Sequence, residues 1–397
     1  MPVNPPELAP EFIDLIKGDV PVGLAVSGGG DSVALLHLVA RLGGRVTVAS
    51  VDHGLRAEAA SECAMVAQIC AGYGMSHQVL HWTGWDGSGN LQDQARRARY
   101  RLLADWAQAS GVTDVALGHT ADDQAETLIM ALARGAGVDG LAGMAATTVK
   151  SRIRFHRPLL HATRQQLRAY LTAGGHRWCD DPSNDDAGFE RIRVRQAAQM
   201  FAQLGLTPTS LGQVARHMAA AAQALGQQHD DLTGALLRQH GDMLVTIPLR
   251  DMATEPARRL VLAAMGWVNR NLAAPRRDKQ MRLMQALRNG QATTLAGCLF
   301  GFDGPVLRIS RELQAVTDHV TTTKALWDRR WRLTGPHDAS LQLRALGAGI
   351  TECADWRLAG LPHASLKATP AVWRDDRLIC APLAGFGTGW TAQIVAE

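Results

Sequence analysis

Residues 27–32, which read SGGGDS, are the first whose types and spacing could do chemistry. Consecutive glycines let backbone N–H groups turn inward, and the N-terminus of a following helix adds positive potential, so such a loop can cradle phosphate. The apolar runs at 22–26 and 33–40 predict a buried strand before the loop and a helix after it. The loop is neither a Walker A motif, because no Gly-Lys-Ser or Gly-Lys-Thr follows, nor a G-x-G-x-x-G fingerprint.

Asp31 and Ser32 close this motif where a Walker loop would carry a lysine and a hydroxyl. An acid beside a phosphate cradle is useful if it holds Mg²⁺, which then bridges to the phosphates. The alternative interpretation is a glycine-rich turn in which Asp31 or Ser32 is only the helix N-cap. The predicted strand and helix on either side favour the phosphate site.

Two further segments place polar side chains after predicted strands. Asp52 and His53 follow the strand at 45–51, and an acid about 20 residues beyond a glycine loop often meets a ribose. Its alternative is a loop aspartate that caps the next helix, with His53 merely exposed.

The second segment, GHTADDQAET at 118–127, places Asp123 and Glu126 three residues apart and so on one helix face. Asp122 could cap that helix or join a metal shell, and acids in a first helical turn are often only partners of the helix dipole.

Arginine dominates the basic residues, with 36 Arg and 5 Lys in a chain of net charge +4. Genomic base bias is one explanation, and the better bidentate binding of phosphate by Arg is another. One group, Arg96, Arg97, Arg99 and Arg101, lies on a predicted helix at 91–109. A second group lies between 256 and 290, where the sequence has eight basic residues and one acid. These residues form either an RNA-binding surface or a solvated helix face.

The elements that must position these residues alternate along the first half of the chain. Strands are predicted at 22–26, 45–51, 77–82 and 112–117, with helices between them, and this order is typical of right-handed βαβ units in an α/β doubly wound parallel sheet. Ligands of such sheets bind outside the carboxyl ends of the strands. The sequence from 192 to about 287 has helical spacing, and a smaller mixed region begins near Trp331. We therefore expect an α/β domain at 1–205, a helical domain at 206–325 and a small mixed α/β C-terminal domain at 326–397.

The composition also bears on the compartment. Every long apolar run is broken before about 18 residues, so no membrane span is expected, and the N-terminus lacks the apolar core of a secretory signal. The six cysteines show no C-x-x-C spacing, which argues against a zinc ribbon or a redox pair and favours a reducing, cytoplasmic setting.

Together these motifs resemble a known pattern. SGGGDS after a first strand resembles the PP-loop ATPases, which cleave ATP between the α- and β-phosphates and adenylate a substrate oxygen. Further motifs resemble the tRNA(Ile)-lysidine synthases within that group. They are VDHGLR at 51–56, ARRARY at 95–100, GHTADDQAET at 118–127, RGAGVDGLAGM at 134–144, RPLL at 157–160 and DDPSNDDAGFERIRVR at 180–195. A weaker match continues at 366–387.

The resemblance implies a ligase that uses ATP and Mg²⁺ to join free L-lysine to C2 of the wobble cytidine in the isoleucine tRNA with a CAU anticodon. The implied catalytic residues are Asp31, Arg99, Asp123, Glu126 and Arg191. The implied ATP contacts are Ser27, Gly28, Gly29, Gly30, Asp31, Ser32, Asp52, His53, Gly118 and His119. Asp31 and Asp122 are the implied Mg²⁺ ligands. The resemblance also implies that the domain at 1–205 is catalytic and that those at 206–325 and 326–397 bind the tRNA. Many family members dimerise, so a homodimer is one expected assembly.

Two alternatives stay open from the residues alone. Another PP-loop enzyme, a sulfur-inserting tRNA thiolase, would need a catalytic cysteine or a cysteine-bound cluster, and Cys179, beside the polar loop at 180–189, is the one to test. A nucleotide-binding RNA module without catalysis would bind ATP without exchanging pyrophosphate. The acids at Asp31, Asp123 and Glu126 argue against that module.

Overall fold

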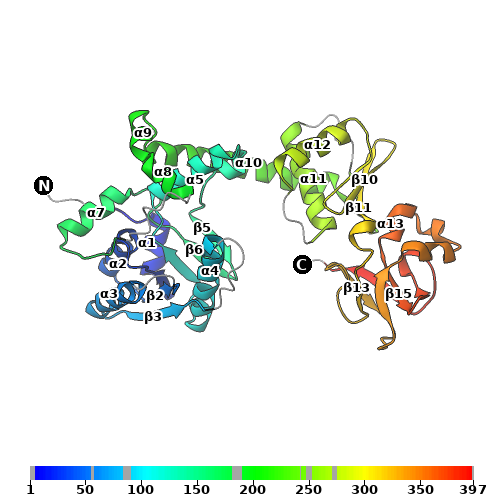
Figure 1. Ribbon diagram of the computed structural model, residues 1–397, viewed down its shortest axis with the longest axis horizontal. Coiled ribbons are helices and arrows are strands. Elements are labelled where there is room, and N and C mark those ends of the chain that lie inside the picture. Colours follow the sequence, from blue (N-terminus) through cyan, green and yellow to red (C-terminus); the bar gives the residue numbers. More distant parts are fainter. Residues whose placement is uncertain are drawn as a thin grey trace. The chain divides into compact units, whose positions relative to one another are not determined.

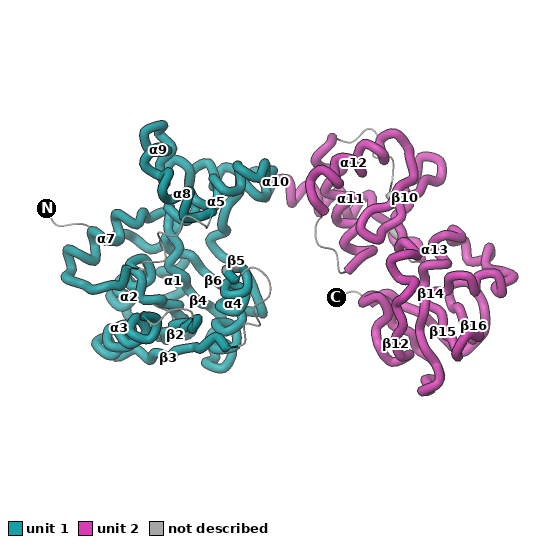
Figure 2. The backbone as a smooth tube through the Cα atoms, viewed as in Figure 1, with its two compact units in different colours: residues 1–223 teal, residues 224–397 magenta. Residues whose placement is uncertain are grey.

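The computed structural model describes residues 5–54, 58–83, 91–180, 190–241, 243–246, 253–270 and 275–395. The chain forms two compact units, residues 1–223 and residues 224–397 (Figure 2). Two segments of the sequence motifs, 55–57 with Arg56 and 181–189 with most of the polar loop, lie outside the described residues.

The first unit is built on a six-stranded sheet in the order β3-β2-β1-β4-β6-β5. Its strands are β1 (Val22–Ala25), β2 (Val46–Asp52), β3 (Ser76–His81), β4 (Asp114–Leu117), β5 (Thr147–Lys150) and β6 (Ile153–His156). All neighbours pair in parallel except β5, which pairs antiparallel with β6. The chain runs outward from β1 through β2 to β3 on one side and continues with β4 on the other, so the strand order reverses between β1 and β4. The predicted doubly wound parallel sheet is confirmed.

Helices cover both faces of this sheet (Figure 1). The helices of this unit are α1 (Pro10–Lys17), α2 (Gly30–Leu42), α3 (Ala59–Gly72), α4 (Leu91–Ala109), α5 (Ala121–Ala133), α6 (Val138–Leu141), α7 (Arg164–Ala173), α8 (Glu190–Gln196), α9 (Ala198–Gln203) and α10 (Pro208–Leu236), which runs into the second unit. One apolar core joins α1, α2, α3 and α7 to the central strands, and another joins α4 to β4 and β6. The buried runs of β1 and β4 follow from this double coverage, because a strand with helices on both faces has no solvent side.

The second unit contains more sheet than the sequence analysis expected. In its first part, α11 (Thr254–Val268) and α12 (Arg277–Arg288) pack on an antiparallel sheet in the order β7-β8-β11-β10-β9. These strands are β7 (Arg238–His240), β8 (Met243–Thr246), β9 (Thr293–Leu295), β10 (Cys298–Asp303) and β11 (Val306–Arg311). The region expected to be helical, 206–325, is therefore helical and stranded. The strands β7, β8 and β9 have only three or four residues, which is too little alternation to be separated from helical spacing in the sequence.

The last part of the chain is mixed, as expected. A four-stranded sheet contains β12 (Thr321–Thr322), β14 (Gln342–Ala345), β15 (Pro370–Arg374) and β16 (Arg377–Cys380), and β13 (Trp331–Thr334) pairs with β17 (Thr391–Ile394). The helices are α13 (His363–Lys367) and the 3₁₀ turns Leu313–Ala315, Gly347–Glu352, Trp356–Ala359 and Pro382–Ala384. Across the described parts of both units, every helix is too short or too polar to span a bilayer.

One glycine sets how closely the end of β4 approaches the start of α2. A Cβ atom on Gly118 would lie 2.9 Å from Ser32 Cα and 3.0 Å from Ser32 N. Both are backbone atoms, which cannot move aside as a flexible side chain can. Gly118 therefore keeps the end of β4 against the loop that opens α2.

We predict that Gly118→Ala destabilises the first unit by about 1–3 kcal/mol, because the added methyl group forces two backbone segments apart. Thermal and urea unfolding would measure the loss. Gly212→Ala, inside α10 with no atom within 4 Å of its added Cβ, is the matched control and should be neutral or slightly stabilising. Equal stability of Gly118→Ala and the parent protein would contradict the packing role.

Candidate active site

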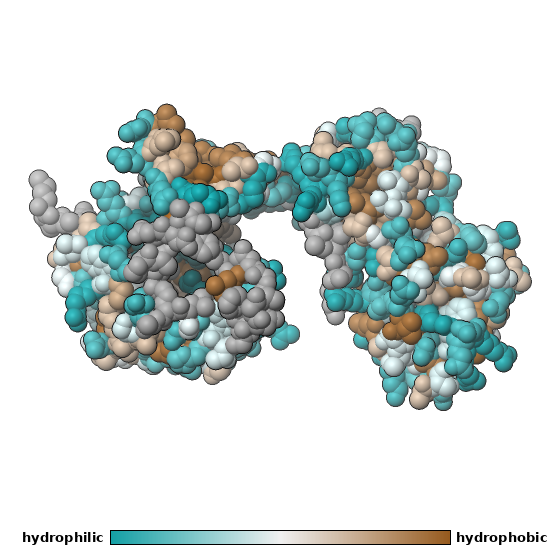
Figure 3. Space-filling model, in the orientation of Figure 1, coloured by the Kyte–Doolittle hydropathy of each residue, from teal (hydrophilic) through white to brown (hydrophobic). Residues whose placement is uncertain are grey.

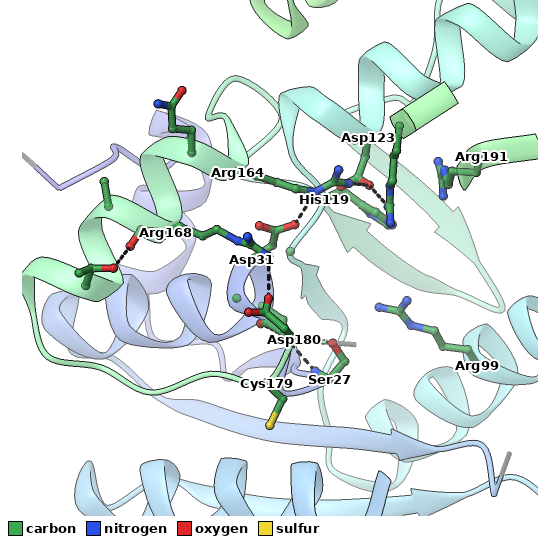
Figure 4. Close-up of a pocket in the computed structure, with 18 of the residues that line it drawn as sticks. Ser27, Asp31, Arg99, His119, Asp123, Arg164, Arg168, Cys179, Asp180 and Arg191 are labelled. Carbon is green, nitrogen blue, oxygen red and sulfur yellow. Dashed lines mark hydrogen bonds and ion pairs between the residues drawn. The ribbon is translucent and has the colours of Figure 1, made fainter. Parts of the chain in front are cut away.

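A cleft of about 1110 Å³ lies at the carboxyl ends of β1 and β4, where the strand order reverses (Figure 4). This is the edge where ligands of open α/β sheets bind. Of the residues expected at the site, the structure brings together Ser27, Gly29, Gly30, Asp31, Ser32, Arg99, Gly118, His119, Asp123 and Arg191 as lining of the cleft. The cleft is also lined by Arg96, Arg164, Arg168, Cys179, Asp180 and Arg195.

The glycine loop holds its shape through its own serines. The Ser27 N–H donates to Ser32 Oγ at 3.1 Å, and Ser32 Oγ donates to the Gly29 carbonyl at 2.9 Å. Gly28 has a φ of 91°, a conformation that favours glycine. Helix α2 begins at Gly30 with Gly29 as an N-cap that has no side-chain cap bond. Asp31 and Ser32 therefore lie inside the first turn, and the helix end faces the cleft as the phosphate interpretation requires.

The centre of the site is a residue that the sequence analysis missed. Arg164, the first residue of α7, places Nη2 at 2.6 Å from Asp123 Oδ1, Nη1 at 2.8 Å from Glu126 Oε1 and Nε at 3.2 Å from Asp31 Oδ2. Its backbone N–H donates to Asp122 Oδ2 at 2.8 Å. We call these five residues the Arg164 cluster. A cation at the first position of a helix is opposed by the helix dipole, and that mismatch is the one signal in the sequence that could have singled Arg164 out.

Glu126 is surrounded by three guanidinium groups. Besides Arg164, its carboxylate lies 3.0 Å from Arg191 Nε and 2.6 Å from Arg195 Nε, and its side chain is 6% exposed. Arg191 and Arg195 come from α8, so this carboxylate ties α5 to α7 and α8. Both oxygens of Glu126 are engaged, and a further ligand there would have to displace an arginine.

The carboxylates of the cluster differ in how readily they ionise. Burial raises the pKa of Asp31 to about 6, against the opposing effect of Arg164 and with a further raising effect from Asp123. Burial also acts to raise the pKa of Asp123, but Arg164, His119 and the Thr120 N–H outweigh it and the net direction is down. His119 is held neutral, because burial and Arg99 lower its pKa to about 3. Asp123 is therefore firmly ionised at neutral pH, whereas the neighbouring Asp31, whose pKa is raised, takes up a proton more readily.

Other expected residues have different surroundings. Asp52 and His53 lie at the end of β2 and do not line the cleft: Asp52 Oδ1 accepts the Gly54 N–H at 2.8 Å, and Oδ2 lies 3.5 Å from His81 Nδ1. Asp122 acts on the N-terminus of α7 rather than on its own helix. Arg99 lines the cleft from α4, and no carboxylate of the described residues pairs with it.

The donor set bears on the expected metal. The described residues contain no group of three or more His, Cys, Asp and Glu side chains that could hold a metal ion by themselves. Mg²⁺ usually takes only one or two protein carboxylates and completes its shell with waters and substrate phosphates. Asp31, a carboxylate beside the phosphate cradle, fits that pattern.

Cys179 does not have the surroundings of a reactive thiolate. It is half-buried at the edge of the cleft, and its thiol donates to Met65 Sδ at 3.7 Å. Its backbone N–H donates to the Gly28 carbonyl at 3.0 Å, so the segment packs on the glycine loop. The contacts that the structure gives Cys179 are structural.

The fold and this cleft define the chain as a PP-loop ATP-using enzyme, and a PP-loop domain family matches residues 8–200. The tRNA(Ile)-lysidine synthase of Ruegeria pomeroyi is 48% identical over 94% of this chain and 91% of its own length. The enzymes of that name from Methylobacterium nodulans and Novosphingobium aromaticivorans are 38% and 40% identical, over 73% and 70% of this chain and 90% and 84% of their own. The chain belongs to the tRNA(Ile)-lysidine synthase family.

A thiolase is only a distant structural neighbour. The U34-tRNA thiolase NcsA of Methanococcus maripaludis is 17% identical, with a TM-score of 0.46, over 53% of this chain and 75% of its own.

The pKa of Asp31 predicts a stability that depends on pH. The folded protein keeps this proton to about pH 6, whereas the unfolded chain loses it near 3.8, so Asp31 lowers the free energy of unfolding as the pH rises through that window. Asp31→Asn mimics the protonated form. In metal-free buffer it should stabilise the protein by on the order of 2 kcal/mol at pH 7.5 and by little at pH 4.

Chemical unfolding at both pH values would measure this difference. Asp105→Asn, on the exposed side of α4, is the control and should change stability by less than about 0.5 kcal/mol at either pH. A gain for Asp31→Asn that is equal at pH 4 and pH 7.5 would contradict the burial effect.

Proposed function

We propose that this chain joins the ε-amine of free L-lysine to C2 of the wobble cytidine in the isoleucine tRNA with a CAU anticodon. The cytidine O2 attacks the α-phosphorus of ATP and pyrophosphate leaves; the amine then attacks C2, the C2–O bond breaks, AMP leaves, and one proton is released. The observation that carries the proposal is that an uncapped helix N-terminus and a buried carboxylate cluster meet in one cleft. One half of that site suits phosphate and the other suits an amine.

Ser27, Gly28, Gly29, Gly30 and Ser32 would receive the phosphates of ATP, because the helix end and its backbone N–H groups attract anions without a bound counterion. Arg99 would neutralise charge that develops as pyrophosphate leaves. Gly118 supports this loop by its close packing, and neutral His119 lies beside it.

Asp31 would hold Mg²⁺, with Asp122 or Asp123 as a second carboxylate, and the ion would polarise the phosphates when bound. Asp52 and His53 would meet the ribose side of the nucleotide from the end of β2. Arg164 already balances Asp31 in the described structure, so metal and arginine would share the same carboxylate.

Lysine would bind on the other side of the cluster. Asp122, Glu126, Arg164 and Arg195 line a second pocket of about 190 Å³, whose remaining walls are mainly apolar and include Ile129, Phe201, Leu206 and Leu211. Apolar walls suit the methylene chain of lysine, an arginine suits its α-carboxylate, and a carboxylate suits an amine that must lose a proton before it attacks. Asp123 and Glu126 are the acids we assign to this step, and Arg191 orders Glu126 from α8.

The rest of the chain would hold the tRNA. We propose the division 1–205, 206–325 and 326–397, with the last two parts as RNA-binding domains. Exposed basic side chains of α12, among them Arg277, Lys279 and Arg282, support a phosphate-binding role for the middle part. Two of the basic residues on α11 are less available to RNA, because Arg258 and Arg259 pair with Glu255 on the same helix.

A homodimer is part of the proposal as well. Met200 and Leu204 near α9 and Val214 on α10 are 65%, 71% and 45% exposed, and apolar side chains gather over these helices (Figure 3). An apolar face of this kind is what a second copy would cover. Sedimentation of the free protein would show whether it does.

We predict lysine incorporation into the CAU-anticodon isoleucine tRNA when the protein is incubated with ATP, Mg²⁺ and labelled lysine. Asp31→Ala should abolish pyrophosphate release while the dissociation constant for tRNA changes less than about threefold, because the residue acts on the nucleotide and not on RNA. Absence of RNA-dependent incorporation by the parent protein would refute the function. Equal losses of adenylation and tRNA affinity would refute the role of Asp31.

Glu126→Gln tests the division between the two half-reactions. The neutral amide keeps the shape but loses the charge that orders three arginines and would assist the amine, so lysine attack should slow more than pyrophosphate release. Single-turnover assays that follow pyrophosphate and lysidine separately would measure both rates. Glu190→Gln, which breaks the exposed pair with Arg134, is the control and should affect neither. A larger effect of Glu126→Gln on pyrophosphate release would place Glu126 with the nucleotide.

A further inference from the structure

A second basic cavity lies next to the cleft, between α4 and the β5–β6 hairpin. It has a volume of about 370 Å³ and is lined by Asp93, Arg96, Arg97, Tyr100, Arg101, Lys150 and Ser151. We call it the Tyr100 pocket. Four of these side chains are cations, and Asp93 is the one carboxylate among the described lining residues. None of the roles assigned above to ATP, Mg²⁺ or lysine uses this pocket.

Two of the cations lie against the ring of Tyr100. Lys150 Nζ lies 3.9 Å from the ring centroid, and Arg96 Cζ lies 5.4 Å from it. The ring itself is fixed, because Arg157 Nη2 donates to the Tyr100 hydroxyl at 3.2 Å and Phe155 packs edge to face at 5.0 Å. Two like charges near one fixed ring repel each other, so an anion close to them lowers the energy of both.

Little among the described residues neutralises this charge. Asp93 pairs with Arg97 at 2.8 Å, but both side chains are more than half exposed, so the pair contributes little. Within the described part of the chain, no carboxylate pairs with Arg101 or Lys150. The described lining of the pocket therefore has a net positive charge, which a soluble anion would neutralise.

The hairpin turn beside Lys150 is tied to α4. Ser151 and Arg152 form the two-residue loop between β5 and β6, and their φ values of 49° and 66° are the positive values that such tight hairpin turns use. Gln108 of α4 donates to the Ser151 carbonyl at 2.9 Å. The turn that follows Lys150 is therefore held against the helix that carries the arginines.

Arg96 lines both the Tyr100 pocket and the cleft, so the two cavities are adjacent. A nucleotide whose base enters the cleft has its strand continuing outside it, with a phosphate at every residue of the RNA. We propose that the Tyr100 pocket binds a backbone phosphate of the substrate RNA next to the modified base, with Lys150 and Arg101 as its principal cations. The inference rests on the proposed function in taking RNA as the substrate.

The test is a double substitution, Lys150→Ala with Arg101→Ala, in the full-length protein. Its dissociation constant for the isoleucine tRNA should rise about tenfold at moderate salt, and the slope of log K against log salt should become shallower by about 1. ATP affinity and the rate at saturating tRNA should stay unchanged, so the loss falls on KM. The conservative pair, Lys150→Arg with Arg101→Lys, should restore most of the tRNA affinity.

The control removes the same charge elsewhere in the unit. Arg41→Ala with Arg45→Ala changes two exposed arginines at the end of α2 and the start of β2, away from the carboxyl edge of the sheet. Comparable melting temperatures would show that both double variants fold. An unchanged tRNA affinity and salt slope, or an equal loss in the control, would overturn the proposal. A loss of ATP affinity would assign the pocket to the nucleotide instead.

This outcome is separable from the proposed reaction. If the parent protein binds the tRNA but adds no lysine, the proposed function fails while the binding measurements still decide the pocket. If the parent protein adds lysine and the double variant binds tRNA as the parent does, the proposed function stands and the pocket assignment fails.

Discussion

The site depends on one guanidinium group placed among carboxylates at the sheet edge. Arg164 lies at the start of α7, where the helix dipole opposes it, and it stays there because Asp31, Asp123 and Glu126 surround its side chain and Asp122 accepts its N–H. Without that cation, three partly buried carboxylates would face each other within one cavity, at a large cost in charge repulsion and desolvation. The same contacts join α2, α5 and α7, so the acid cluster and the packing around the cleft are one structure.

Acidic and basic side chains around the cleft are separated rather than evenly mixed. The carboxylates gather around Arg164, and Arg191 and Arg195 of α8 pair with Glu126. Arg96 and Arg99 come from α4, and no carboxylate of the described residues pairs with Arg99. Phosphate groups would thus meet cations and helix N–H groups in the cleft, while a substrate cation would meet the acids from the second pocket beside it. A net charge of only +4 hides this separation.

Most strands and helices of the first unit could be predicted from the pattern of apolar residues. Strands predicted at 22–26 and 45–51 are β1 and β2, and the helix predicted at 91–109 is α4. These predictions are correct because a buried strand or an amphipathic helix requires a regular spacing of apolar residues within its own segment. The β5–β6 hairpin and the strands β7–β9 were missed, because strands of three or four residues leave a pattern that neighbouring residues obscure; the six-residue strands β10 and β11 were missed as well. Most of these strands pair with the next strand along the chain, but β6 joins β4 and β8 joins β11 across longer stretches of sequence.

The residues of the site also fall into those that the sequence could predict and those that it could not. The glycine loop, Asp31, Asp123 and Glu126 were identifiable in the sequence, since a phosphate cradle and a shared helix face depend on residues within one or two turns of each other. Arg164 was not, because it is 133 residues from Asp31 and shows its function only when α7 packs beside α2. The sequence by itself determined the sheet, the loop and the local acids. Only the tertiary structure decided which cation balances those acids, because charge pairing depends on distance in space and not on spacing along the chain.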